Sequence, residues 1–388
     1  MKNFCNLILV SAGQIIYLNK MKKIKIFLQR PWKISDSSYY KYLSEELPEN
    51  IEYVNLNFEK SPTITSSKDF WRNHFLKQRI KKFFRKTRIP YPNAHRTKNA
   101  KRYDLIHCAH CLSWNRKVPW ICDIEYSDQF YVGNKSEFLK KIVRKILLRK
   151  NCKKIMAWSE WSKKNILKEF PELKNKVEIV YPALPLGKFG KRDYRKINLL
   201  FVGRDFIGKG GEIALEVMND LTKKYKNVYG EIISDIPKEF YEKYSENKKI
   251  KISNLVPHEK LFGEIYPDSD VLIYPTRSDT LGFAILEAQS FGIPVIATKT
   301  SSTHTINETI SDGKTGFIIP GDFSAWSGNE KEKKKIADGI IKNTEKLIGN
   351  KNLLKKMSES CVKEFKDGKF SIKERNKKLE KIFSESLK

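Results

Sequence analysis

Residues 270–298, DVLIYPTRSDTLGFAILEAQSFGIPVIAT, decide the fold class. The apolar run at 271–274 predicts a buried strand, a polar loop follows, and 283–291 has the character of a short helix. Gly292 then ends the helix and Pro294 begins the next strand. This order of strand, loop, helix and strand predicts a parallel sheet, and open parallel sheets bind ligands at the carboxyl ends of their strands.

Short apolar runs alternate with helical stretches along the whole chain, which predicts an α/β protein. A stretch at 181–196, rich in Pro, Gly and charge, separates two such series, so we expect two Rossmann-like parallel-sheet domains that face a cleft. The predicted units are an N-terminal domain at 21–185, a linker at 186–196, a C-terminal domain at 197–366 and a helix at 367–388 that returns to the first domain. The predicted strands are 24–28, 51–56, 105–108, 120–124, 154–158 and 177–181 in the first domain, and 197–202, 229–234, 249–253, 271–274, 294–297 and 316–319 in the second.

The first 20 residues and the cysteines bear on location. Residues 4–18 are apolar but shorter than the roughly 20 residues that a membrane span needs. Met21 then opens a predicted strand, so 1–20 is expected to be an upstream extension outside the fold, with a signal anchor as the alternative. The cysteines are not spaced as a disulfide framework, which favours a cytoplasmic protein. They are Cys5, Cys108, Cys111, Cys122, Cys152 and Cys361.

The chain is strongly basic, with 75 Lys and Arg against 45 Asp and Glu and a net charge of +30. Such a surface attracts nucleic acid, anionic lipid or phosphate-bearing small molecules. Two stretches, 71–88 and 138–149, combine an apolar and a basic face at helical spacing. They predict either a peripheral contact with an anionic membrane or solvated helices that pack on the sheet. No nucleic-acid-binding signature accompanies the charge, so nucleic acid is not expected as a partner.

Two acids frame the loop of the opening motif. Asp279 precedes the predicted helix and Glu287 lies one turn inside it, while Gly282 lets a ligand approach the free N–H groups at the helix start. Peptide N–H groups attract phosphate and carboxylates accept hydrogen bonds from sugar hydroxyls. The loop therefore predicts a site for a sugar phosphate.

A second loop, 199–211 (LLFVGRDFIGKGG), carries two cations before a predicted helix. Arg204 and Lys209 can hold a diphosphate there without a metal ion. The glycine spacing is not that of a Walker A loop.

These landmarks resemble one family in order and spacing: Gly203, Arg204, Lys209 and Gly210, then 279–288, then 292–295, then 312–316. The chain resembles the retaining glycosyltransferases of family 4, which have the GT-B fold. The resemblance implies that Arg204 and Lys209 hold the donor diphosphate, that Asp279 contacts the transferred sugar and that Glu287 binds the nucleotide ribose. It also implies a substrate-binding backbone at Gly203, Leu281, Gly282, Phe283 and Ala284. The family has Glu where this chain has Asp279, so the shorter side chain is a departure.

The first domain matches the family less closely. Its loop at 29–38 has no glycine, and the cleft candidates are Asp123, Glu125 and His110. The sequence 107–111 (HCAHC) offers His and Cys, but a closed zinc site needs further ligands at comparable spacing, so no metal is expected.

The resulting expectation is a metal-independent enzyme that needs no cofactor. It would move a hexose from a UDP- or GDP-linked donor to a lipid-linked or glycan acceptor with retention of configuration, at the cytoplasmic face of a membrane. Two alternatives stay open: a nucleotide-sugar isomerase of similar architecture, and a non-catalytic basic protein that binds polyanions.

Overall fold

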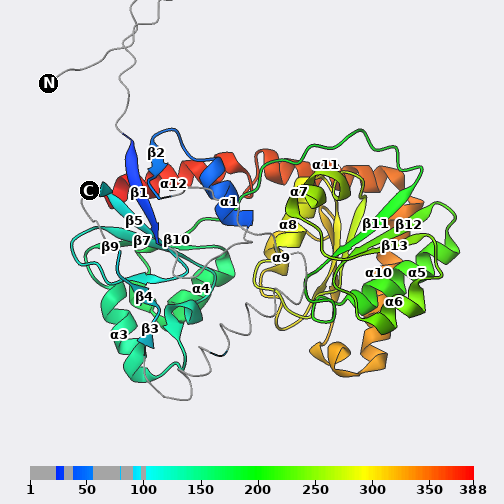
Figure 1. The fold of residues 1–388 in the computed structure, drawn as a ribbon, viewed down its shortest axis with the longest axis horizontal. Coiled ribbons are helices and arrows are strands. Elements are labelled where there is room, and N and C mark those ends of the chain that lie inside the picture. Colours follow the sequence, from blue (N-terminus) through cyan, green and yellow to red (C-terminus); the bar gives the residue numbers. More distant parts are fainter. Residues whose placement is uncertain (1–22, 30–37, 56–78, 80–90, 98–101) are drawn as a thin grey trace, which may run out of the picture.

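The computed structural model describes residues 23–29, 38–55, 79, 91–97 and 102–388. They form two α/β domains that lie side by side, each built on its own sheet (Figure 1). The predicted extension at 1–20 lies outside the described residues, as do the loop at 30–37 and, apart from Arg79, the basic stretch at 71–88.

The N-terminal sheet has the strand order β10-β9-β7-β5-β1-β2, and all its neighbouring strands are parallel. Its central strands are buried from end to end, because helices cover both faces of a parallel sheet. The elements are β1 (Ile24–Gln29), α1 (Ser38–Glu45), β2 (Ile51–Tyr53), β5 (Leu105–Ala109), β7 (Trp120–Ile124), α3 (Glu137–Leu147), β9 (Cys152–Ala157), α4 (Glu160–Glu169) and β10 (Val177–Ile179).

Two small ladders lie beside this sheet. Antiparallel strands β3 (Tyr91–Pro92) and β8 (Tyr131–Val132) form one, and parallel strands β4 (Ala94–His95) and β6 (Leu112–Ser113) form the other. Strands of two residues leave no periodic pattern, which is why the sequence did not predict them.

The C-terminal sheet has the order β13-β12-β11-β14-β15-β16, which is the doubly wound order 3-2-1-4-5-6 of a dinucleotide-binding fold. Its strands are β11 (Ile197–Val202), β12 (Val228–Ile233), β13 (Ile250–Ser253), β14 (Val271–Tyr274), β15 (Val295–Lys299) and β16 (Gly316–Pro320). Its helices are α5 (Gly211–Lys224), α6 (Lys238–Tyr244), α7 (His258–Lys260), α8 (Phe283–Ser290), α9 (Ile306–Thr309), α10 (Glu330–Gly349) and α11 (Lys351–Lys366). Shorter helical turns throughout the chain are η2 (Ser127–Phe130), η3 (Pro171–Leu173), η4 (Leu261–Ile265) and η5 (Phe323–Ser327).

The last helix, α12 (Ile372–Ser386), lies against the N-terminal domain (Figure 1). The buried Arg375 donates to the carbonyl oxygens of Tyr42 at 3.1 Å and of Glu46. Phe383 packs near His107, with ring centroids 6.3 Å apart. The chain therefore connects the domains twice, after β10 and before α12.

The predicted fold class, α/β with two parallel-sheet domains, is confirmed. Each predicted strand corresponds to a strand of the two six-stranded sheets, with ends that differ by up to three residues. Among the helices that the structure describes, none combines the length and the apolar composition that crossing a bilayer requires.

Candidate active site

The loop between β14 and α8 holds Asp279 in a fixed position. Its carboxylate accepts hydrogen bonds from Lys209 Nζ at 2.7 Å, from the Tyr274 hydroxyl at 2.7 Å and from the Gly282 N–H at 3.0 Å. The side chains of Lys209 and Asp279 are 26% and 19% exposed, so the pair remains open to a ligand. The predicted loop acid and the predicted loop lysine are thus in direct contact.

Two glycines make this contact possible. Gly210 and Gly282 precede α5 and α8 with φ values of +76° and +78°, in the left-handed region that favours glycine. A Cβ atom at Gly210 would lie 1.9 Å from the carbonyl oxygen of Pro275. The start of α5 therefore packs directly on the loop after β14, and this close approach brings Lys209 to Asp279.

Arg204 lies in the loop after β11, on the same side of the sheet. Burial and the charge of Asp279 raise the pKa of Tyr274 well above its usual value, and the positive charge of Arg204 opposes this rise. Of the three residues that the sequence predicted as catalytic, Lys209 and Asp279 are in contact, and Arg204 lies in the loop after β11.

Glu287 lies inside α8 and is 8% exposed. It accepts a hydrogen bond from the Tyr266 hydroxyl at 3.0 Å. Burial raises the pKa of Tyr42 in α1, and the charge of Glu287 adds to the rise. Glu287 therefore lies within electrostatic reach of the N-terminal domain.

The predicted substrate-binding backbone surrounds the start of α8 and the end of β11. Gly203 and Leu281 are buried, while Phe283 and Ala284 are half-buried. The Phe283 ring meets Trp158 of the N-terminal domain edge to face, with centroids 5.8 Å apart. The start of α8 thus touches the other domain.

Glu125 and His110 form a pair on the N-terminal side. His110 Nε2 lies 3.7 Å from Glu125 Oε1, and Gln129 Oε1 contacts both His110 Nδ1 at 3.0 Å and the Glu125 N–H at 2.9 Å. Burial raises the pKa of Glu125, and the charge of Asp279 contributes in the same direction. Because that influence crosses the domain boundary, Glu125 lies within electrostatic reach of the loop between β14 and α8.

Asp123 has a different environment, since it is fully buried. It accepts hydrogen bonds from the Tyr40 hydroxyl at 2.6 Å and from Trp158 Nε1 at 3.2 Å, and His107 Nε2 lies 3.1 Å away. These contacts occupy the carboxylate, so Asp123 supports the wall of the domain and Glu125 is the more accessible acid of the two.

The cysteines of the first domain lie in its core. Gln29 Nε2 lies 3.4 Å from Cys108 Sγ and 3.5 Å from Cys111 Sγ, and both thiols are buried. In the part of the chain that the structure describes, no three His, Cys, Asp or Glu side chains come together as a metal site would require.

Sequence reasoning missed Tyr274, Tyr266 and Trp158. Tyr274 ends a buried strand at its carboxyl end, a position that could have identified it. Tyr266 and Trp158 reach the site only through tertiary packing and leave no local signal.

Comparison with known proteins gives a family match for the C-terminal domain. Residues 196–329 match the family model described as Glycosyl transferases group 1. The chain is 29% identical over 234 residues to an uncharacterized 41.2 kDa protein in the cps region of Klebsiella pneumoniae. That match covers 57% of this chain and 58% of the relative, so the chain spans less than two thirds of the relative's length.

Solved structures share the fold at low sequence identity. A glycosyltransferase from Rickettsia africae ESF-5 has a TM-score of 0.60 and 18% identity, and the alignment covers 94% of this chain and 99% of that one. The pneumococcal O-GlcNAc transferase GtfA, solved in complex with UDP and GlcNAc, has a TM-score of 0.54 and 14% identity, with 73% of this chain and 57% of that one covered.

The C-terminal domain thus matches a glycosyltransferase family model, and the whole chain shares the two-domain GT-B fold of a solved glycosyltransferase. These findings do not favour the alternatives of an isomerase or a polyanion-binding protein.

Proposed function

We propose that this chain is a retaining glycosyltransferase of family 4 that moves a hexose from a UDP- or GDP-linked donor to a glycan or lipid-linked acceptor. The observation that carries the proposal is the contact between Lys209 and Asp279, 2.7 Å apart, at the starts of two helices of a doubly wound domain. A phosphate-binding cation and a sugar-binding acid are held together where such domains bind nucleotides.

The donor would be held by groups of this domain alone. Arg204 and Lys209 neutralise the diphosphate, and the charge that develops on the leaving group is stabilised by these cations and by the N–H groups at the start of α8. Asp279 accepts hydrogen bonds from hydroxyls of the transferred sugar, and Glu287 accepts them from the ribose. Two cations suffice for the diphosphate, so the reaction as proposed needs no metal.

The acceptor would enter from the N-terminal domain, beside Glu125 and His110. Closing the domains expels water, which would otherwise compete as an acceptor. The UDP and GlcNAc bound by GtfA support a nucleotide-sugar donor here.

We further propose peripheral attachment to an anionic membrane at its cytoplasmic face. Helix α3 buries Leu139 and Val143 in the domain core but leaves Phe138 63% exposed. Lys141 and Lys145 are exposed on the same helix, which lies on the outer side of the N-terminal domain (Figure 1). Exposed apolar side chains among lysines suit an anionic lipid surface.

A panel of UDP- and GDP-sugars tests the function. We expect nucleotide release from a subset of donors, and nuclear magnetic resonance of the glycoside product should show the anomeric configuration of the donor. A product of inverted configuration would contradict the retaining mechanism, and a lack of release from every donor would contradict a glycosyltransferase.

A further inference from the structure

The two domains are joined at Glu308, a residue of α9 in the C-terminal domain. Its carboxylate accepts hydrogen bonds from the backbone N–H groups of Glu160 at 2.8 Å and Trp161 at 2.9 Å, the first two residues of α4 in the N-terminal domain. The Ser159 side chain caps only the next N–H group, that of Ser162. An acid from one domain therefore completes the positive N-terminus of a helix in the other.

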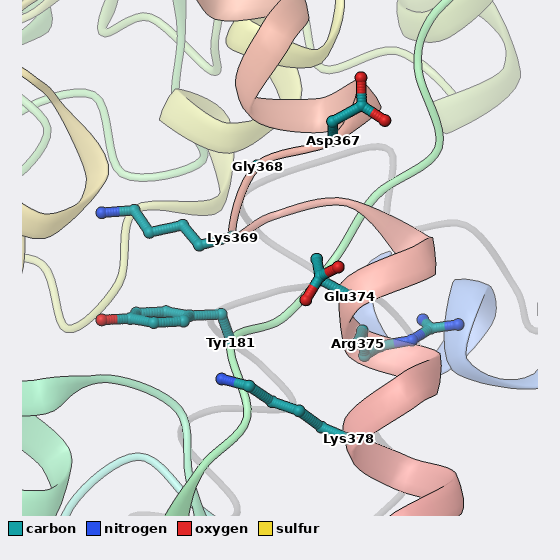
Figure 2. Close-up of a pocket in the computed structure, with 7 residues that line it drawn as sticks. All are labelled: Tyr181, Asp367, Gly368, Lys369, Glu374, Arg375 and Lys378. Atoms are coloured by element: carbon teal, nitrogen blue, oxygen red, sulfur yellow. The ribbon is translucent and has the colours of Figure 1, made fainter.

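Two aromatic contacts surround this carboxylate. The His304 ring stacks on Trp161 across the domain boundary, with centroids 4.1 Å apart and planes 2° from parallel. The Tyr181 hydroxyl donates to Glu308 at 3.0 Å. The Tyr181 ring lies between Lys369 and Lys378, whose ammonium groups are 5.5 and 5.8 Å from its centroid (Figure 2). Both chain crossings thus contribute to the contact.

Figure 2 shows a pocket at this place, lined by Tyr181, by residues 367–369 and by Glu374, Arg375 and Lys378 of α12. It contains none of the predicted site residues, and its basic and acidic side chains occur together. Lys369 and Lys378 of this pocket flank Tyr181 and so belong to the surroundings of the Glu308 contact.

The segment that carries His304 also holds the backbone of Asp279. The Asp279 N–H donates to the carbonyl oxygen of Ser302 at 3.1 Å, and the His304 N–H donates to the carbonyl oxygen of Asp279 at 3.3 Å. The buried Thr305 hydroxyl donates to the carbonyl oxygen of Thr280 at 2.7 Å. Residues 300–305 therefore form the support on which the Asp279 loop rests.

We propose that Glu308 and the stack of His304 on Trp161 couple closure of the two domains to the position of the Asp279 carboxylate. Glu308 is a positioning residue, and the inference rests on the proposed function because Asp279 is there the acid that contacts the sugar. When the domains separate, the first N–H groups of α4 lose their hydrogen bonds to the Glu308 carboxylate, and residues 300–305 lose their contact with the N-terminal domain. The donor site is then complete only when the acceptor domain is docked.

Glu308→Gln tests this coupling against Glu345→Gln. Glu345 also accepts from a tyrosine hydroxyl, that of Tyr225, but this contact lies within the C-terminal domain. Because a small misplacement far from the chemistry lowers the rate, we expect Glu308→Gln to lower kcat by about tenfold to a hundredfold. Wild-type kcat in Glu308→Gln, or an equal loss in Glu345→Gln, would overturn the coupling.

A double-mutant cycle adds the second contact. His304→Ala and Trp161→Ala remove the two sides of one stack, so the double variant should lose no more kcat than either single variant. Additive losses would mean that each ring acts only within its own domain, which would remove the stack from the proposal.

Hydrogen exchange separates the coupling from the proposed function. Without any nucleotide, the amides at the start of α4 should exchange faster in Glu308→Gln than in Glu345→Gln, and UDP should slow their exchange in the wild type but not in Glu308→Gln. Equal exchange in the two variants overturns the coupling even if the enzyme is active. If the wild type releases nucleotide from no donor, the proposed function fails, and the exchange without nucleotide still decides whether Glu308 joins the domains.

Discussion

At the scale of single residues, Asp279 is the clearest departure from the family that the sequence resembles. Its short side chain lets the carboxylate accept hydrogen bonds from Lys209, from the Tyr274 hydroxyl and from the Gly282 N–H. Asp279→Glu extends the side chain by one methylene, which cannot keep all three contacts in the same geometry. We therefore expect the length of the acidic side chain at position 279 to determine which donor sugar is preferred.

The prediction is that Asp279→Glu changes the order of donors by kcat/KM rather than improving every donor equally. Initial rates with the donor panel measure this. Tyr274→Phe is the control, because it removes one hydrogen bond and leaves the length of the acid unchanged. A uniform gain for all donors would show that Asp279 is only a weaker form of the usual acid.

Glu287→Gln is expected to weaken the binding of UDP and GDP, since a neutral amide accepts hydroxyl protons less strongly than a carboxylate. Isothermal titration calorimetry measures the affinity directly. Tyr266→Phe is the matched control: it removes the 3.0 Å contact to Glu287 and keeps the charge. Unchanged affinity for both nucleotides in Glu287→Gln would exclude Glu287 from the donor site.

At the scale of elements, the buried acid Asp270 links β14 to β11 and makes the free energy of unfolding depend on pH. Asp270, just before β14, accepts from the Asn198 N–H at 2.8 Å, and Arg192 Nε lies 3.6 Å away. Burial outweighs these contacts and raises the pKa of Asp270 from 3.8 to about 6. The folded protein therefore binds more protons than the unfolded chain between these values.

The free energy of unfolding should consequently fall as the pH rises through that window, by on the order of 3 kcal/mol for this residue. Below this window Asp270 is protonated in both the folded and the unfolded state, so its burial does not lower the free energy of unfolding. Above the window Asp270 is ionised in both states, and the full loss of stability is present. Asp270→Asn removes the titration, so its stability relative to the wild type should increase with pH in urea unfolding. Asp220→Asn, at an exposed position of α5, should follow the wild type. If the free energy of unfolding of Asp270→Asn and that of the wild type changed with pH in parallel, the prediction would be contradicted.

Helix α3 provides the test of membrane attachment. Its apolar face packs in the core, yet Phe138 at its start and Leu148 just after its end are 63% and 45% exposed. Each nearby Lys or Arg contributes about 1 kcal/mol on an anionic surface, so the wild type should float with anionic vesicles at low salt. Replacing both apolar residues by Ser should reduce flotation.

Tyr241→Ser is the control for this experiment, because Tyr241 is 51% exposed on α6 of the other domain. The basic stretch at 71–88 is present in the wild type and in every variant, so the difference in flotation between the wild type and the double Ser variant measures the part of α3. A wild type that stays in solution with anionic vesicles at low salt would exclude the membrane proposal.

At the scale of the whole molecule, the sequence predicted the elements well because their signals are local. The apolar run at 271–274 predicts a strand, and the glycines at 210 and 282 indicate turns. The sequence placed Lys209 and Asp279 in loops after two strands of one sheet, but it did not predict that their side chains are in contact.

The sequence could not predict contacts between segments that are far apart along the chain but close in space. Nothing in residues 306–309 indicates that Glu308 completes α4, which begins 148 positions earlier in the chain. In the same way, Asp123 and Glu125 are only two residues apart, but packing buries the first entirely and leaves the second 22% exposed as a side chain. Such differences arise from tertiary packing, which single-sequence patterns do not record.

The central claim is that Lys209, held beside Asp279 at 2.7 Å, stabilises the leaving nucleotide during sugar transfer. The most direct measurement compares nucleotide release by the wild type, Lys209→Ala and Lys224→Ala, each shown to be folded by circular dichroism. Lys224 also pairs with a carboxylate of its domain, that of Glu345 at 2.6 Å, but lies away from the predicted site residues. We predict that Lys209→Ala loses about a hundredfold to a thousandfold in kcat and that Lys224→Ala keeps the wild-type rate. A folded Lys209→Ala variant with near-normal release would contradict the account.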